Sequence, residues 1–116
     1  MSLKVYGISN CDTVKKARKW LEANNIEYTF HDFKKSGVPQ SNLEAWLNAL
    51  GVETLVNKRG TTWRKLSDSD KADIESGAKT QELLSEHSSV IKRPVIETPS
   101  GEVITGFTPS QLEKYA

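Results

Sequence analysis

The chain has 116 residues and a mass of 13.0 kDa, a length that fits one domain with one hydrophobic core. Its formal net charge is only +1, so we expect no direct binding to nucleic acid or membrane. No apolar run approaches the ~18 residues of a membrane span, and the N-terminus lacks the apolar core of a signal peptide. One cysteine excludes an internal disulfide, and we expect a cytoplasmic monomer.

The N-terminal part predicts a strand, a helix and a second strand. Leu3–Ile8 and Tyr28–Phe33 are apolar and strand-like, and apolar residues recur at helical spacing within Asp12–Ala23. Asn24 and Asn25 supply a left-handed stop for the helix. Two strands joined through one short helix predict a βαβ unit with parallel strands.

Cys11 lies where the first predicted strand gives way to the helix. Unpaired N–H groups and the positive end of the helix dipole favour an anion there. A thiol so placed is biased toward thiolate, the form that attacks electrophiles, although the neighbouring Asp12 carboxylate opposes this bias. The carboxyl ends of strands are also where ligands bind in α/β sheets. We therefore interpret Cys11 as a nucleophile rather than as an inert core residue.

The middle of the chain predicts short helices joined by polar segments. Residues 34–39 form a polar connection, and Ser41 with Glu44 reads as a capping box for a helix that stops at Gly51. Residues 55–64 are basic and irregular. Ser67 caps the next helix, and a further one runs from Thr80 to about residue 87. We interpret residues 40–88, approximately, as a helical insertion.

The last part returns to strands. Residues 90–98 lead through a Pro-Ser-Gly turn at 99–101 into 102–106, which comes back as an antiparallel partner. Thr108 is expected to cap a final helix with Pro109 at its first position. The order is βαβ, helices, ββα. Residues 1–35 and 90–116 then form the sheet-containing core of a single domain that spans 1–116.

Several motifs carry a resemblance to a known family. They are Gly7–Ala17, Asn57–Gly60 with Trp63, Lys92–Ile96, and Thr98–Gly101 followed by Gly106 and Phe107. Together with the element order they resemble the thioredoxin-like fold and, within it, the ArsC/Spx family, closest to its YffB-like branch. The resemblance implies an α/β protein with a mixed sheet and a helical insertion between its two halves.

Arsenate reductases of this family use a helix-opening cysteine together with glutathione and glutaredoxin. Cys11 matches that nucleophile, and Arg93 matches an anion-binding arginine beside a proline. The reductases also carry arginines where this chain has Asn57 and where it has Gly106 or Phe107. Because tetrahedral oxyanions need several guanidinium donors, arsenate reduction stays an alternative rather than the first interpretation.

Spx-type members of the family carry a Cys-x-x-Cys switch and bind RNA polymerase. The second cysteine position is Val14 in this chain, which excludes an internal redox switch. A non-catalytic, Spx-like regulator that binds RNA polymerase is the other alternative.

The resemblance and the single thiol together favour a glutathione-dependent thiol–disulfide reductase. A lone thiolate forms a mixed disulfide that only an external thiol resolves, and glutathione is the expected co-substrate. Glutaredoxin is an optional partner, and the substrate is a small-molecule or protein disulfide. One cysteine and two scattered histidines exclude a closed zinc site, and no bound cofactor is expected.

The expected site has three parts. They are the catalytic Cys11, the thiolate-stabilising Asn10 and Thr13, and the substrate- or anion-binding Arg93, Arg59, Lys58 and Pro94. Pro94 is expected to follow a cis peptide bond, as it does in this fold, and to present the backbone before it to a peptide substrate.

Overall fold

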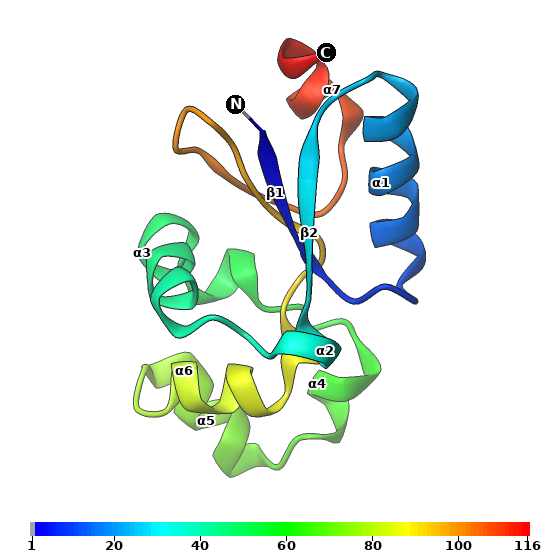
Figure 1. Ribbon diagram of the computed structural model, residues 1–116. Coiled ribbons are helices and arrows are strands. Elements are labelled where there is room, and N and C mark those ends of the chain that lie inside the picture. Colours follow the sequence, from blue (N-terminus) through cyan, green and yellow to red (C-terminus); the bar gives the residue numbers. More distant parts are fainter. Residues whose placement is uncertain (1) are drawn as a thin grey trace. The chain divides into compact units, whose positions relative to one another are not determined.

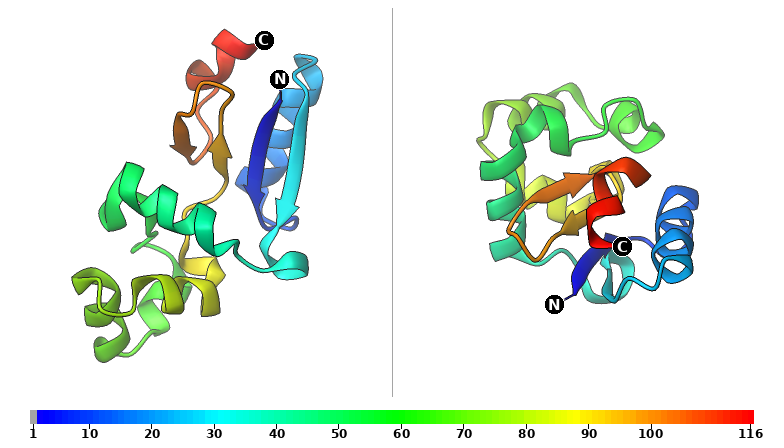
Figure 2. Two further views of the ribbon diagram at one scale, coloured as in Figure 1. Left: turned by 60° about the vertical axis from the view of Figure 1, so that its left-hand side comes forward. Right: turned by 90° about the horizontal axis from the view of Figure 1, so that it is seen from above.

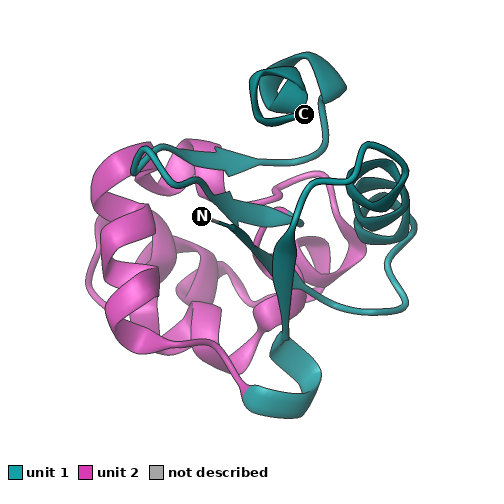
Figure 3. Ribbon diagram, turned by 45° about the horizontal axis from the view of Figure 1, so that its top comes forward, with its two compact units in different colours: residues 1–36, 93–116 teal, residues 37–92 magenta. Residues whose placement is uncertain are grey.

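The computed structural model describes residues 2–116, which divide into two compact units (Figure 3). Unit 1 contains the residues up to 36 together with 93–116, and unit 2 contains 37–92. Across residues 2–116, no helix is both long and apolar enough to cross a membrane.

Unit 1 is built on a four-stranded mixed sheet. Its elements are β1 (Leu3–Gly7), α1 (Asp12–Ala23), β2 (Tyr28–Asp32), α2 (Phe33–Ser36), β3 (Val95–Glu97), β4 (Val103–Thr105), α7 (Pro109–Leu112) and a 3-10 helix (Glu113–Tyr115). The strand order is β2-β1-β3-β4, with β1 and β2 parallel and the other neighbours antiparallel (Figure 1). The predicted βαβ…ββα mixed sheet is confirmed.

The core of unit 1 lies against one face of this sheet. It is formed by Leu3, Val5, Leu21, Ile26, Ile96, Ile104 and Leu112. Val5 pairs with Ile96 and Ile96 with Ile104, so the three side chains form a row on the same face. Both α1 and α7 contribute a leucine to this cluster, and Figure 2 shows α1 running alongside β1 and β2. Each fully buried apolar side chain contributes about 1.5–3 kcal/mol to folding.

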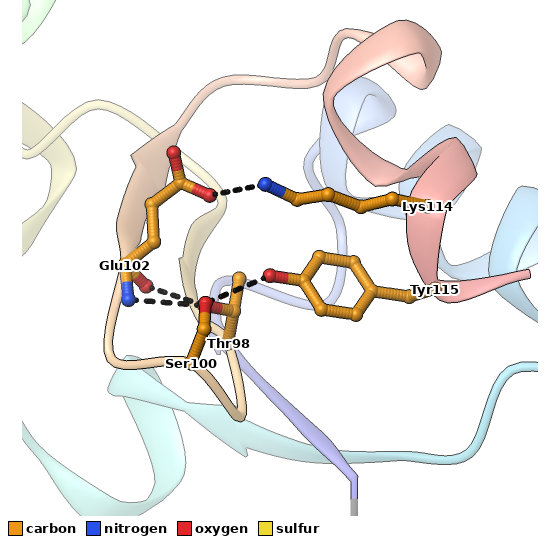
Figure 4. Close-up of polar contacts among 5 residues, drawn as sticks. All are labelled: Thr98, Ser100, Glu102, Lys114 and Tyr115. Carbon is orange, nitrogen blue, oxygen red and sulfur yellow. Dashed lines mark hydrogen bonds and ion pairs between the residues drawn. The ribbon is translucent and has the colours of Figure 1, made fainter.

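Polar contacts tie the C-terminal segment to the turn between β3 and β4 (Figure 4). The Tyr115 hydroxyl lies 3.1 Å from Ser100 Oγ, which is 3.0 Å from Thr98 Oγ1. The hydrogen bonds with Ser100 and then Thr98 lower the pKa of the Tyr115 phenol. Lys114 also forms an exposed ion pair with Glu102 at 3.2 Å, which adds little stability in water.

Unit 2 is helical. It contains α3 (Gln40–Leu55), α4 (Thr61–Lys65), α5 (Asp68–Ser76), α6 (Thr80–Glu86) and a 3-10 helix (Ser88–Val90). Leucine, isoleucine and tryptophan side chains from these helices are buried, with Leu43, Trp46, Leu55, Ile74 and Leu84 fully so. An isolated bridge joins Val56, which follows α3, to Ile91 near the C-terminal end of the unit.

Several helix ends follow the sequence signals. Asn25 has a left-handed φ of 57° after α1, and Ser67 accepts a hydrogen bond from the Asp70 N–H at 3.1 Å as the cap of α5. Pro109 is the first residue of α7, as predicted, and Thr108 precedes it without a side-chain cap. The Ser41 capping box is wrong, because the helix begins at Gln40 after an extended Pro39. Gly51, with φ 78° and ψ 163°, is non-helical and divides α3 into two helical segments, so the first segment stops at Gly51 as predicted.

Other boundaries also differ from the sequence-based expectation. The polar connection at 34–39 is partly helical, since α2 begins at Phe33, and the irregular basic segment contains α4. The strand predicted from residue 90 forms only at Val95–Glu97. Pro94 lacks the N–H that a sheet ladder requires, and Ile91 pairs with Val56 instead.

Gly7 allows the end of β1 to pack against α1. A Cβ on Gly7 would lie 2.8 Å from Cγ2 of the fully buried Val14, a contact too short for carbon atoms. We predict that Gly7→Ala lowers the free energy of unfolding by about 1–3 kcal/mol, measured by urea denaturation. Gly60→Ala is the matched control, because its Cβ would lie 3.0 Å from the Asn57 side-chain amide and at an ordinary contact distance of 3.6 Å from the Asn57 carbonyl oxygen.

A double variant tests whether the clash with Val14 causes the loss of stability in Gly7→Ala. In a Val14→Ala background the space beside Gly7 is empty, so Gly7→Ala should cost clearly less there. An equal cost in both backgrounds would contradict the proposed clash.

Candidate active site

Cys11 is the N-cap residue of α1 and is partly exposed. Its N–H donates to the Ile8 carbonyl at 3.1 Å, which closes a turn, and its own carbonyl accepts the Lys15 N–H at 2.9 Å. The Cys11 side chain makes no capping hydrogen bond. The N–H groups of the first helical turn therefore lie beside a thiol that no capping contact holds.

The carboxylate of Asp32 fixes the turn that precedes Cys11. Asp32 ends β2, is 8% exposed, and accepts the Lys34 N–H at 2.8 Å. It also accepts the N–H of Lys35 and both the hydroxyl and the N–H of Ser9. Burial raises the pKa of the Asp32 carboxyl, but these hydrogen bonds outweigh burial and leave the pKa below its usual value.

Arg93 lies beside the start of α1. Tyr6 of β1 pairs with Val95 of β3, so the residues just before Val95 run next to the end of β1. The Cβ position of Gly7 is 3.8 Å from Arg93 Cβ and also contacts Val14 in the first turn of α1. The stem of Arg93 and the helix turn that follows Cys11 therefore approach the same point of the sheet.

The guanidinium of Arg93 is not neutralised by the carboxylates available to it on its own hairpin. Glu97 accepts a hydrogen bond from Tyr6 at 3.0 Å, and Glu102 pairs with Lys114 at 3.2 Å. Among residues 2–116, Arg93 forms no ion pair, and its side chain is partly exposed. An unpaired guanidinium is available for an anionic ligand.

The other predicted residues of unit 1 are near the same place. The Arg93–Pro94 peptide bond is cis, as the resemblance leads us to expect, and Pro94 is buried with its carbonyl accepting the Gly106 N–H at 2.9 Å. Asn10 and Thr13, on either side of Cys11, are exposed. Their role in stabilising a thiolate stays a prediction.

Lys58 and Arg59 belong to unit 2. The Lys58 ammonium lies 3.4 Å from Glu75 and 5.7 Å from the centre of the Trp63 ring, so its charge is already engaged. Arg59 is exposed, and its N–H donates to Asn57 Oδ1 at 3.2 Å. Their predicted contribution to anion binding stays a prediction.

The positions where arsenate reductases carry arginine are otherwise occupied. Phe107 packs edge-on against Trp20, with ring centres 6.2 Å apart, and joins the core of unit 1. Asn57 organises the turn before α4 through its contact with Arg59. In the described part of the chain, no cluster of three or more His, Cys, Asp or Glu side chains is arranged to hold a metal ion.

Asp32 is a residue near the candidate site that the sequence alone does not indicate. As a single aspartate at a strand end, it carries no motif of its own. The signal that could have found it is topological, because parallel pairing of the two strands places Asp32 opposite Gly7, just before the Cys11 turn. Asp32 also acts as the N-cap of α2, because its carboxylate accepts the N–H groups of Lys34 and Lys35. This explains why α2 starts at Phe33.

Comparison with known proteins gives a consistent picture. The family model described as "ArsC family" matches residues 6–115. An uncharacterized protein of Haemophilus influenzae is 40% identical over 111 residues, which is 96% of each chain. The solved structure of the YFFB (PA3664) protein is 41% identical, with a TM-score of 0.89 and 98% of each chain covered.

Two further relatives indicate the range of the family. An arsenate reductase (ArsC) related protein from Brucella melitensis is 46% identical, with a TM-score of 0.73, over 99% of this chain and 94% of that one. The global transcriptional regulator Spx 1 of Lactococcus lactis is 23% identical over 97% of this chain and 88% of the regulator.

The hydrogen bonds to Asp32 predict a pH dependence of stability. Because the folded-state pKa is below the unfolded value of about 3.9, the carboxylate stabilises the fold above that value. The contribution is lost as the pH falls through the folded pKa. We expect Asp32→Asn to be less stable than the wild type at about pH 6, with a difference that shrinks toward about pH 3 in urea denaturation.

Asp73→Asn is the matched control, since Asp73 is a partly exposed aspartate of α5. It should change the unfolding free energy little at either pH. A difference between wild type and Asp32→Asn that stays constant over this pH range would contradict the assignment.

Proposed function

Because the chain belongs to the ArsC family, we propose that it is a thiol reductase that works with glutathione and uses Cys11 as its nucleophile. The observation that carries this proposal is the position of Arg93. Its Cβ lies 3.8 Å from the point where a Cβ on Gly7 would stand, a point that Val14 in the first turn of α1 also approaches. Its guanidinium has no carboxylate partner among the described residues. A thiol at a helix start and an unpaired cation beside it suit an anionic disulfide.

The proposed reaction has two thiol–disulfide exchanges. The Cys11 thiolate attacks the glutathione sulfur of a mixed disulfide, forms a Cys11–glutathione disulfide and releases the substrate thiolate, which takes up a proton from water. A second glutathione, as thiolate, attacks the glutathione sulfur of that adduct. Oxidised glutathione leaves, and the Cys11 thiolate is restored. One substrate disulfide is reduced, and two glutathione units are joined.

Because the chain has a single thiol, the proposed Cys11 adduct has to be reduced by a thiol from outside the chain. Val14 stands three residues after Cys11 and is fully buried in the first turn of α1. No second cysteine is present to resolve the adduct internally. Glutathione also offers carboxylates for the Arg93 guanidinium, which binds planar carboxylates through paired hydrogen bonds.

Arsenate reduction is the alternative that the relatives bring forward, since one of them is described as related to arsenate reductases. The packing of Phe107 against Trp20 counts against it. The phenyl ring of Phe107, which packs against the core, gives no donor to an oxyanion, and binding a tetrahedral anion takes several fixed donors. A non-catalytic regulatory role is the other alternative, since one relative is a global transcriptional regulator, and such a role would not require Cys11 to react.

We predict that the wild-type chain takes up one glutathionyl group when it is incubated with oxidised glutathione, and that Cys11→Ser takes up none. Intact-mass spectrometry before and after addition of reduced glutathione measures both formation and release of the adduct. A wild-type chain that takes up no glutathione while remaining folded would contradict the proposal. Turnover that depends on arsenate, with glutathione and glutaredoxin present, would support the alternative.

Arg93 is expected to bind the anionic part of the substrate. Replacing it with alanine removes a charge-assisted contact, so the Michaelis constant for a glutathione mixed disulfide should rise about tenfold or more. Lys92→Ala is the matched control, because Lys92 is the preceding residue, is exposed and carries the same charge. Equal effects of the two substitutions would show that only the net charge matters.

A further inference from the structure

The turn that carries Cys11 is held from one side by a single buried group. Asp32 is 8% exposed and pairs with Gly7 of β1, two residues before Ser9. Its carboxylate accepts the Lys34 N–H at 2.8 Å, and the N–H of Lys35 and both the N–H and the hydroxyl of Ser9 also donate to it. A carboxylate has about four acceptor sites, so it can bond to α2 and to Ser9 at the same time. The arrangement is more than a helix cap, because capping α2 requires only the N–H groups of Lys34 and Lys35.

The two bonds from Ser9 act on the reactive segment. Ser9 and Asn10 are the central residues of the turn that the Cys11 N–H closes on the Ile8 carbonyl. Ser9 donates both its N–H and its hydroxyl to Asp32, which fixes the turn against the end of β2. The orientation of Cys11 relative to the start of α1 therefore depends on a residue that lies 21 positions further along the chain.

We propose that Asp32 is a positioning residue for Cys11, and that it acts through Ser9 by holding the Ile8–Cys11 turn in the orientation that reacts with an anionic disulfide. This inference rests on the proposed function. Asp32 does not touch the sulfur by any contact in the structure, and it takes no part in the exchange chemistry. Its contribution is orientation, which is worth large factors in rate when the reacting atoms must align.

Three roles for Asp32 predict different results. A positioning role predicts that its loss slows the reaction with a bulky, anionic disulfide more than the reaction with a small neutral alkylating reagent. A purely electrostatic role predicts the opposite, because removing a negative charge near the site favours an anionic reagent. A purely structural role predicts no change in the ratio of the two rates at a temperature where the variant is folded.

The experiment measures the rates of Cys11 with oxidised glutathione and with iodoacetamide, by mass spectrometry on the full chain. The rate with oxidised glutathione divided by the rate with iodoacetamide should fall about tenfold in Asp32→Asn. It should fall about threefold in Ser9→Ala, which loses only the hydrogen bond from the Ser9 hydroxyl to Asp32. Ser9→Thr keeps a hydroxyl and should restore the wild-type ratio. Asp73→Asn, on α5, should leave it unchanged.

A double variant tests whether the two residues act together. Since Ser9 is proposed to act only through Asp32, Ser9→Ala should have no further effect in an Asp32→Asn background. If Asp32→Asn does not fold, Ser9→Ala and Ser9→Thr carry the test, because α2 keeps its cap in both. An unchanged or increased ratio in the folded variants would overturn the positioning role.

The same data separate this inference from the proposed function. The first comparison is between the folded wild type and the urea-unfolded chain. If the ratio of the two rates is the same in both, folding gives Cys11 no preference for oxidised glutathione, and both the proposed function and the positioning role fail. If the folded wild type shows the preference and the variants keep it, only the positioning role fails.

Discussion

The pairing of β1 with its two neighbours is the constraint on which the candidate site depends. Parallel pairing with β2 places Asp32 opposite Gly7, and antiparallel pairing with β3 brings Arg93 past the same strand end. The glycine itself lets α1 start close to the sheet. Strand pairing thus gathers the candidate nucleophile Cys11, the carboxylate of Asp32 and the guanidinium of Arg93, which forms no ion pair within residues 2–116.

The parts of this arrangement that could be predicted are those with local signals. Cys11 at a strand–helix junction, the asparagine stop after α1 and the Ser67 cap each follow from residues within one turn of the chain. Asp32 could not be found in this way, because its partners become visible only when β1 and β2 are aligned. The short β3 has a similar cause, since Pro94 interrupts the ladder and Ile91 takes a distant partner.

The residues around Cys11 limit which ligands the candidate site can bind. In this chain Arg93 lies near the start of α1, and the second cysteine position is the buried Val14. An arginine position of the reductases falls on Gly106 or on Phe107, whose partly buried ring packs against the core. Such a site suits a ligand with a few carboxylates better than a compact oxyanion, since each guanidinium pairs with one carboxylate. The same fold can therefore serve different reactions through a few substitutions around the helix start.

We propose that Cys11 and Arg93 contact the same ligand, the first through its sulfur and the second through its guanidinium. A crystal structure of the chain with glutathione disulfide-linked to Cys11 tests it most directly. We expect a glutathione carboxylate within hydrogen-bond distance of the Arg93 guanidinium, with the Ser9–Asp32 contacts unchanged. An ordered glutathione whose carboxylates all lie away from Arg93 would contradict it.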